Sequence, residues 1–313
     1  MPVVSHVSRP WPQWLLLIAL LSACGKSPSA PDDQKNPGGD GPYRLIHTDG
    51  LGRRVEVVRR PARIISLAPS VTEVLYLVGA ADRLVGVTIH CDWPADARSK
   101  PKIGDLLNPN AELILAARPD LVIASTAGND RSAVLRLAEL GLPVFVTAPR
   151  TIAGIFDTVE QIGRITGCEE QAAGLAVDMR SRLDALGRRL GGAPRIRAFY
   201  ITWFEPLLAP GKGTFENEVL SHAGVDSITA GIPEFYPRYS LEQVLAHAPQ
   251  AILAVRHEGN PLPELRALPG WRELDAVKQG RIFLVGEALQ HPSPRFLDAL
   301  EDLARRLHPE RVP

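Results

Sequence analysis

The stretch "NAELILAARPDLVIA" at residues 110–124 has a second copy, "SLEQVLAHAPQAILA", at residues 240–254. Each copy begins with a residue that caps helices, and then carries Glu, Leu-Ala, Pro and an apolar run that ends in Ala. The first half of each copy predicts a helix that ends at the proline, and the apolar run predicts a buried strand. Two equivalent helix–strand units predict two similar α/β lobes in one chain.

The residues around the first copy predict an N-terminal α/β lobe over residues 43–150. It opens with a hairpin that turns at Asp49-Gly50. Ser70-x-x-Glu73 has the pattern of a capping box at a helix start. Four short apolar runs alternate with helical segments, and they are predicted strands at residues 63–68, 84–88, 120–125 and 143–147. This alternation implies a parallel sheet that helices cover on both faces.

A helical segment without any strand signal follows at residues 151–191, and it predicts a connector between the lobes. Gly163, Gly167 and Gly174 leave open whether it is one long helix or two abutting helices. Alternation then resumes and predicts a C-terminal α/β lobe over residues 192–313, including a helix at 270–280. The predicted fold class is α/β, with two Rossmann-like lobes that have parallel sheets and are joined by a long, rigid helical connector. A cleft between the lobes is the natural ligand site.

The N-terminal residues predict export. Arg9 precedes an apolar run at residues 14–23, which is about half the length that a spanning helix needs. Leu21-Ser22-Ala23-Cys24 resembles the lipobox of bacterial lipoproteins, so we expect a signal peptide at residues 1–23 and a lipid on Cys24. Residues 24–42 are rich in Pro, Gly, Ser and Asp and predict a flexible tether.

The composition is that of a globular protein, with 45% hydrophobic residues. Lys and Arg together number 35, as do Asp and Glu, so nothing in the charge balance indicates nucleic acid as a partner. After Cys24 the chain has Cys91 and Cys168. An oxidising compartment permits a disulfide between them, but two cysteines far apart in the sequence are weak grounds for one.

Two long blocks of the chain show a family resemblance. They are "RIISLAPSVTEVLYLVGA…NPNAELILAARPDLVIAS" and "APGKGTFENEVLSHAG…YSLEQVLAHAPQAILAV". They resemble vitamin B12-binding periplasmic proteins and their relatives, the substrate-binding proteins of ABC importers for cobalamin, iron-siderophores and haem. The resemblance covers nearly all of the chain after residue 43. It implies the class III periplasmic binding protein fold, in which a rigid helix joins the two lobes.

The resemblance also implies a function. We expect a lipoprotein, anchored at the periplasmic face of a bacterial membrane, that captures cobalamin or a related corrinoid and delivers it to the dimeric permease of an ABC importer. It implies no cofactor and no catalytic residue. A receptor for a ferric siderophore or haem is the alternative in the same fold. An enzyme and a sensor or adaptor are further alternatives.

In the family, one surface glutamate on each lobe docks onto arginines of the permease, and Glu112 and Glu242 match those positions. Charge pairs of this kind set register and speed up encounter. The alternative is that each glutamate only stabilises its helix, because an acid in the first turn favours the macrodipole by about 0.3–1 kcal/mol.

The candidate ligand contacts lie in loops that follow the predicted strands. By resemblance to the cobalamin-binding proteins, the contacting positions are Pro69, Ser70, His90, Thr202, Tyr236, Glu287 and His291. Trp93 and Trp203 join them because aromatic faces hold large flat ligands well. The loops also contain Phe204, Phe235 and Tyr239. Leu106 and Ser125 depart from the family, since the cobalamin binder has tryptophans there.

Other ligands and activities have weaker sequence support. The candidate histidines lack the spacing of zinc ligands, so no metal site is predicted. They are His90, which adjoins Cys91 and Asp92, and the scattered His222, His247, His257 and His291. His90, Tyr236 or His291 could ligate a haem iron, and Arg238 and Arg295 could face an anionic siderophore. The segment "APGKGTF" does not match a phosphate-binding loop, and no hydrolase or metalloprotease motif occurs.

Overall fold

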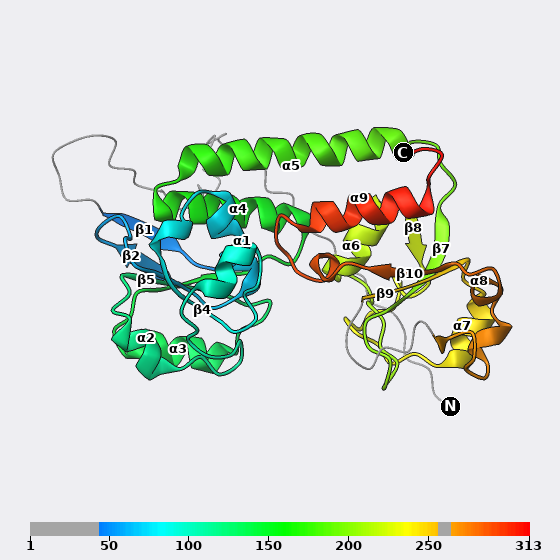
Figure 1. The fold of residues 1–313 in the computed structure, drawn as a ribbon, viewed down its shortest axis with the longest axis horizontal. Coiled ribbons are helices and arrows are strands. Elements are labelled where there is room, and N and C mark those ends of the chain that lie inside the picture. Colours follow the sequence, from blue (N-terminus) through cyan, green and yellow to red (C-terminus); the bar gives the residue numbers. More distant parts are fainter. Residues whose placement is uncertain (1–43, 256–263) are drawn as a thin grey trace, which may run out of the picture. The chain divides into compact units, whose positions relative to one another are not determined.

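The computed structural model describes residues 44–255 and 264–313. Predictions for the signal peptide, Cys24, the tether and His257 lie outside these residues. The described chain contains a two-stranded antiparallel hairpin and two four-stranded parallel sheets (Figure 1). The fold class predicted from the sequence, two α/β lobes with parallel sheets, is confirmed.

The first sheet has the strand order β4-β3-β5-β6. Its strands are β3 (Ile64–Ser66), β4 (Leu84–Val87), β5 (Leu121–Ser125) and β6 (Val144–Thr147). Successive side chains of a strand point to opposite faces. Accordingly Leu121 and Ile123 of β5 pack into one apolar cluster, while Val122 and Ala124 pack into another on the opposite face. Burial on both faces explains why β5 reads as an unbroken apolar run.

Three helices and the hairpin complete this lobe. The helices are α1 (Pro69–Leu77), α2 (Ala111–Ala116) and α3 (Arg131–Glu139), and the hairpin consists of β1 (Leu45–Thr48) and β2 (Arg54–Val57). The hairpin turn joins the sheet through the amide of Gly50, which donates to the carbonyl of Val146 at 2.6 Å. A Cβ at residue 50 would lie 2.5 Å from Cβ of Ala148, so this close approach requires glycine.

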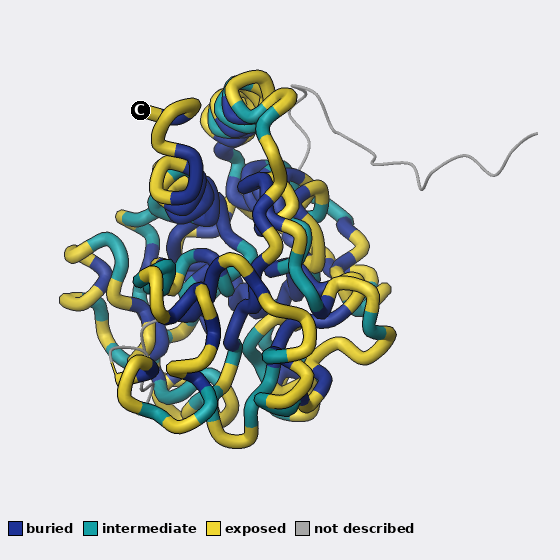
Figure 2. Tube along the Cα trace, turned by 90° about the vertical axis from the view of Figure 1, so that its right-hand side faces the viewer, coloured by how far each residue is buried: buried dark blue, intermediate teal, exposed yellow. Residues whose placement is uncertain are grey.

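The second sheet has the order β10-β9-β7-β8. Its strands are β7 (Ile196–Ile201), β8 (Val225–Ser227), β9 (Ala251–Val255) and β10 (Ile282–Val285), and its helices are α6 (Phe215–His222), α7 (Leu241–His247), α8 (Asp275–Lys278) and α9 (Phe296–Leu307). Figure 2 shows that the buried stretches gather in the interior with exposed ones around them.

The helix predicted at residues 270–280 is wrong in its first half. A 3-10 turn, Trp271–Glu273, is followed by extended backbone at Leu274 (ψ 131°), and only then does the four-residue α8 begin. Trp271 and Leu274 are both buried in the apolar cluster of this lobe. Packing of these two side chains takes the place of a continuous helix.

The connector consists of two helices, α4 (Ile152–Thr166) and α5 (Glu169–Leu190). The chain reverses at Gly167, which has a left-handed backbone (φ 69°), and the two helices lie side by side (Figure 1). At 22 residues, α5 is about 33 Å long. Its buried residues Met179 and Leu186 belong to one apolar cluster with residues of α1 and of α9. The connector therefore shares a single core with both lobes.

The repeated sequence units are structurally equivalent, as predicted. Asn110 and Ser240 cap α2 and α7, since their side chains accept hydrogen bonds from the amides of Leu113 and Gln243. Each helix ends just before a proline in a left-handed residue, Arg118 (φ 45°) or Ala248 (φ 42°). Among the described residues these are the only two non-glycine positions with positive φ. In the second unit, Gln243 completes a capping box with Ser240.

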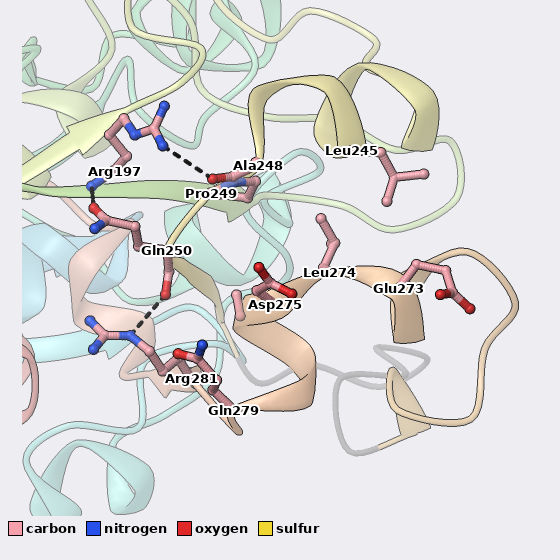
Figure 3. A pocket seen from close by; sticks show the side chains of 11 residues that line it. Arg197, Leu245, Ala248, Pro249, Gln250, Glu273, Leu274, Asp275, Gln279 and Arg281 are labelled. Atoms are coloured by element: carbon pink, nitrogen blue, oxygen red, sulfur yellow. Dashed lines mark hydrogen bonds between the residues drawn. The ribbon is translucent and has the colours of Figure 1, made fainter.

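Polar side chains tie each repeated unit to the amino end of its sheet. In the first lobe, the carboxylate of Asp120 accepts from the amides of Ala62 and Arg63. In the second, Gln250 Oε1 accepts from the amide of Arg197 at 2.9 Å, and Arg281 donates to the Gln250 carbonyl at 2.8 Å (Figure 3). Arg197, Gln250 and Arg281 line a cavity of about 440 Å³ at the amino ends of the strands of the second sheet. Ligands of parallel sheets bind at the carboxyl ends, so this cavity is not the predicted cleft.

Both cysteines of the described chain are buried free thiols. Cys91 lies against the hydroxyls of Thr72 and Thr88, at 3.1 and 3.2 Å. Cys168 lies 2.8 Å from the guanidinium of Arg83. They occupy different surroundings and form no disulfide.

Candidate ligand-binding cleft

Loops at the carboxyl ends of both sheets, together with residues of α1 and α9, line a cavity of about 850 Å³, which we call the main cavity. Pro69, His90 and Trp93 line it from the first lobe, and Glu287 and His291 line it from the second. The structure thus brings together five of the predicted ligand contacts from both lobes. Leu106, the position that departs from the family, also lines it.

A second cavity of about 310 Å³, the side cavity, is also lined by both lobes. Tyr236, another predicted contact, lines it together with Phe235 and Glu216 from the second lobe. Thr126 and Arg150 line it from the first lobe. The cleft therefore offers two compartments, each with aromatic and polar surface.

Three predicted contacts line neither cavity. Ser70 lies in the first turn of α1 and is 9% exposed. Trp203 is 48% exposed, and its indole N–H donates to the carbonyl of Glu205 at 2.8 Å. Thr202 precedes it, and its hydroxyl is buried. Ser125 is fully buried at the end of β5.

Two loop aromatics belong to the core of the second lobe. Tyr239 stacks on Phe199, with ring centroids 5.4 Å apart, and Phe204 packs against Trp271 at 5.7 Å. Their positions in candidate loops therefore reflect local packing, while Phe235, 56% exposed, faces the side cavity.

A buried acid, Glu73, makes polar contacts across the cleft, and its predicted role as a capping-box residue is wrong. No side chain caps α1, which begins at Pro69 after Ala68. Glu73 is 3% exposed, and its carboxylate accepts hydrogen bonds from Ser293 Oγ and, at 3.0 Å, from Arg295 Nη1. Both partners belong to the second lobe. We call these three residues, together with Trp93, the clasp.

Trp93 enters the clasp through its ring. The guanidinium carbon of Arg295 lies 4.6 Å from the centroid of the Trp93 ring, within the range of a cation–π contact. Arg295 therefore bridges two first-lobe residues, the acid Glu73 and the aromatic Trp93. The sequence could not reveal this, because Arg295 lies more than 200 residues from both.

The floor of the side cavity contains a buried acid. Tyr236 donates from its hydroxyl to Glu216 Oε1 at 3.0 Å, and Glu216 is 4% exposed. Burial raises the pKa of the Glu216 carboxyl. Burial and the nearby Glu216 charge raise the pKa of Tyr236 as well. The pair presents a tyrosine ring and a carboxyl group that binds a proton readily.

His90 is exposed at the rim of the main cavity, where its Nε2 lies 3.1 Å from Asp105 Oδ2. The amide of Leu107 and then His90 lower the pKa of the Asp105 carboxyl. The neighbouring residues point elsewhere: Cys91 is buried, and Asp92 lies 4.0 Å from Arg98. Within residues 44–255 and 264–313 no group of three or more His, Cys, Asp or Glu side chains could hold a metal ion.

The fold and cleft define a class of protein: a two-lobed α/β binding protein with a shared ligand cavity. A family model described as periplasmic binding protein matches residues 64–289. The chain belongs to this family of substrate-binding proteins, which work with ABC permeases. No helix of the described chain has the length and apolar character needed to cross a membrane.

Several relatives are named for vitamin B12. The chain is 33% identical over 247 residues to the vitamin B12-binding protein of Vibrio cholerae. This match covers 78% of this chain and 88% of the relative. It is 27% identical over 308 residues to an uncharacterised ABC transporter substrate-binding lipoprotein of Bacillus subtilis, with 96% of each chain covered.

Solved structures show the same fold with different ligands. The periplasmic vitamin B12-binding protein of Vibrio cholerae matches with a TM-score of 0.69 and 32% identity, over 79% of this chain and 97% of that one. The periplasmic haem-binding protein BhuT in complex with two haems matches with a TM-score of 0.69 and 25% identity, over 78% and 97%. The family and fold are therefore shared by binders of more than one large ring ligand.

Proposed function

We propose that this protein captures cobalamin or a related corrinoid in the cleft between its lobes and delivers it to an ABC permease. The observation that supports this most is the main cavity, where predicted contacts from both lobes meet. Its volume of about 850 Å³ lies near the upper end of the range for small-molecule pockets. The B12-binding relatives support the corrinoid as the ligand.

Charge in the main cavity supports a ligand without a large negative charge. Two arginines line it, and each already has an acidic partner: Arg295 pairs with Glu73 at 3.0 Å, and Arg98 lies 4.0 Å from Asp92. Glu287 adds a further acid to the lining. An anionic siderophore would need unpaired cations there, whereas the corrin ring carries mainly neutral amide groups.

Haem is the second candidate, favoured by one observation. His90, His291 and Tyr236, which have the side chains that ligate haem iron, line the two cavities. A haem complex is also known for a structural relative at 25% identity. The test below separates the two ligands.

Delivery would use one glutamate from each lobe. Glu112 and Glu242 lie exposed in the first turns of α2 and α7, the equivalent helices of the repeat. A permease made of two like subunits would need two like contacts, and this arrangement supplies them. We also propose that cleavage before Cys24 and lipidation of this residue anchor the protein at the periplasmic face of the membrane; these residues lie outside the described chain. Binding and delivery involve no chemical reaction.

Calorimetry and visible absorbance test the ligand directly. Purified protein that starts near residue 42 is titrated with cyanocobalamin, hemin and a ferric siderophore. We expect saturable binding of cyanocobalamin at one site. Haem binding without corrinoid binding would replace the ligand and keep the transport role, and binding of none would contradict the proposed function.

Trp93→Ala supplies a site control, because removal of a ring from the main cavity should weaken the complex at least several-fold. Val177→Ala, at a 64% exposed position on α5, is the matched control that should leave affinity unchanged.

A further inference from the structure

A third, smaller cavity of about 220 Å³ adjoins the cleft on the first lobe. Two arginines line it: Arg131, the first residue of α3, and Arg150, in the segment between β6 and α4. Thr126 and Asn129 contribute polar surface, and no acidic residue lines it. We call Arg131, Arg150 and Thr126 the arginine corner.

Both arginines of the corner are exposed and have no partner within the described part of the protein. Among residues 44–255 and 264–313, neither guanidinium makes a hydrogen bond, an ion pair or a ring contact. The nearest acid in the sequence, Asp130, uses its carboxylate to cap α3, where it accepts from the amide of Ala133 at 2.9 Å and from Ser132 Oγ. This contrasts with the main cavity, whose arginines both have acidic partners.

The position of Arg131 is electrostatically unfavourable. The amino end of a helix carries a partial positive charge, so a cation in the first turn is repelled by the macrodipole. A second cation, Arg150, lines the same small cavity and adds to the positive potential there. An anionic oxygen group bound between them would relieve both repulsions, and guanidinium groups suit such groups because they donate in pairs.

The corner is continuous with the side cavity of the cleft. Thr126 and Arg150 line both the third cavity and the side cavity of the cleft. A peripheral group of a ligand that lies in the cleft can therefore reach the two guanidinium groups. The one acid of the described chain that lines the side cavity, Glu216, is buried and hydrogen-bonded to Tyr236, so it does not pair with the arginines of the corner.

We propose that the arginine corner binds a single peripheral anionic oxygen group of the ligand, a phosphodiester or a carboxylate. This inference rests on the proposed function, in which the cleft holds a large ring ligand. In a corrinoid the group is the phosphodiester of the nucleotide loop, and in haem it is a propionate. The corner thereby selects ligands by a charge at their edge, while the main cavity contacts the neutral body of the ring.

The test compares ligands with and without the anionic group. The variant Arg131→Gln with Arg150→Gln and the wild type are titrated with cyanocobalamin and with dicyanocobinamide, which lacks the phosphodiester. Hemin and its dimethyl ester form the second pair. We expect the variant to lose about tenfold or more in affinity for the phosphodiester ligand and to bind cobinamide as the wild type does. If a propionate is the group, hemin loses affinity and its ester does not.

Arg136→Gln with Arg188→Gln is the matched control, since both arginines are exposed and unpaired in the described chain and lie outside the three cavities. It should bind all four probes as the wild type does. Unchanged affinities in the corner variant, or equal losses for both members of a pair, would overturn the proposal. Wild-type protein that binds none of the four would instead overturn the proposed function, and the corner with it.

Discussion

Glu216 shows how one buried carboxyl can make folding stability depend on pH. Its carboxyl is buried beneath the half-exposed ring of Tyr236, and burial raises its pKa. The folded chain therefore holds this proton at pH values at which the unfolded chain has released it. By linkage, folding stability falls as pH rises through the interval between the unfolded and folded pKa values, and the loss is constant above it.

We expect Glu216→Gln to remove this dependence. The amide oxygen of glutamine can still accept from Tyr236, and glutamine carries no charge to desolvate. The stability of the variant relative to the wild type should rise from about pH 4.5 upward and then level off. Thermal unfolding at several pH values measures this difference.

Glu218→Gln provides the comparison. Glu218 lies in the same helix, and its Oε2 accepts from the amide of Ile152 at 2.8 Å. This variant should lose stability at neutral pH, because a charge-assisted hydrogen bond is weakened. A pH-independent effect of Glu216→Gln would show that burial does not control this carboxyl.

Single residues also show what a sequence can reveal about the site. The loops that contain Pro69, His90 and Glu287 were predictable because they follow strands, and the carboxyl ends of parallel strands meet at one edge. The choice of these residues within the loops came from the family resemblance. The role of Glu73 was not, because Ser70-x-x-Glu73 fits a local capping pattern equally well. Its true partners, Ser293 and Arg295, leave no signal near residue 73 in the sequence.

Among the elements, α2 and α7 are the two helices on which the proposed docking to the permease depends. Helices α2 and α7 are short, at six and seven residues, and each buries one apolar residue, Ile114 or Val244. Each presents its first-turn glutamate to solvent. The amide of Glu242 and the side chain of Ser240 lower the pKa of the Glu242 carboxyl, so it is charged at neutral pH.

Reversal of both charges should separate docking from binding. We expect Glu112→Arg with Glu242→Arg to keep ligand affinity within about twofold and to abolish uptake in cells, because like charges across an interface repel. Titration of the purified variant and ligand uptake by cells measure the two effects.

Glu169→Arg with Glu170→Arg is the control for helix stability. These exposed acids occupy the first turn of α5, so their reversal has the same effect on a macrodipole. Normal uptake in this control and in the Glu112 and Glu242 variant alike would contradict the docking role.

Predictions of elements succeeded where a long apolar period decides the structure. The strands of the first sheet, strands β7, β9 and β10 of the second sheet and the repeated helices follow such patterns, and the structure confirms them. Strand β8 was not predicted, because its three residues, Val225–Ser227, form no apolar run. The apolar periodicity of residues 151–191 could not show whether the connector is one helix or two. The chain reversal depends on a single residue, Gly167, which has a left-handed conformation. The segment at residues 270–280 departed because Trp271 and Leu274 pack into the core at the expense of helical backbone.

At the scale of the whole molecule, the lobes are joined by apolar and ionic contacts. Helix α5 shares its core with α1 and α9, and Arg182 of α5 donates to Asp298 at 2.7 Å and to both carboxylate oxygens of Glu301 at 2.9 Å. The clasp adds a partly buried ion pair at the ligand cavity. We infer that these contacts restrict how far the lobes can move when a ligand binds.

A double-mutant cycle measures the strength of the clasp. We expect Glu73→Gln to lower the free energy of unfolding by about 1.5–3 kcal/mol, the range for hydrogen bonds to charged groups. Arg295→Gln should cost a similar amount, and the double variant less than the sum, because the second change removes a partner already lost. Denaturant unfolding without ligand supplies the values.

Arg44 and Glu56 serve as the reference pair. They form an ion pair with side chains 63% and 40% exposed, and exposed pairs contribute about 0–1 kcal/mol. A coupling energy for Glu73 and Arg295 no larger than that of the reference pair would show that the clasp does not hold the lobes together.

The order of the strands along the chain has a consequence for how an exported protein of this kind folds. Each sheet takes its four strands from one continuous stretch, within residues 64–147 and 196–285. The clasp instead links Glu73 to Ser293 and Arg295, which lie 220 and 222 positions further along the chain. The first sheet can therefore form while later residues are still crossing the membrane, but the cleft closes only after Ser293 and Arg295 have emerged. Completion of the ligand site therefore depends on contacts between segments from opposite ends of the described chain.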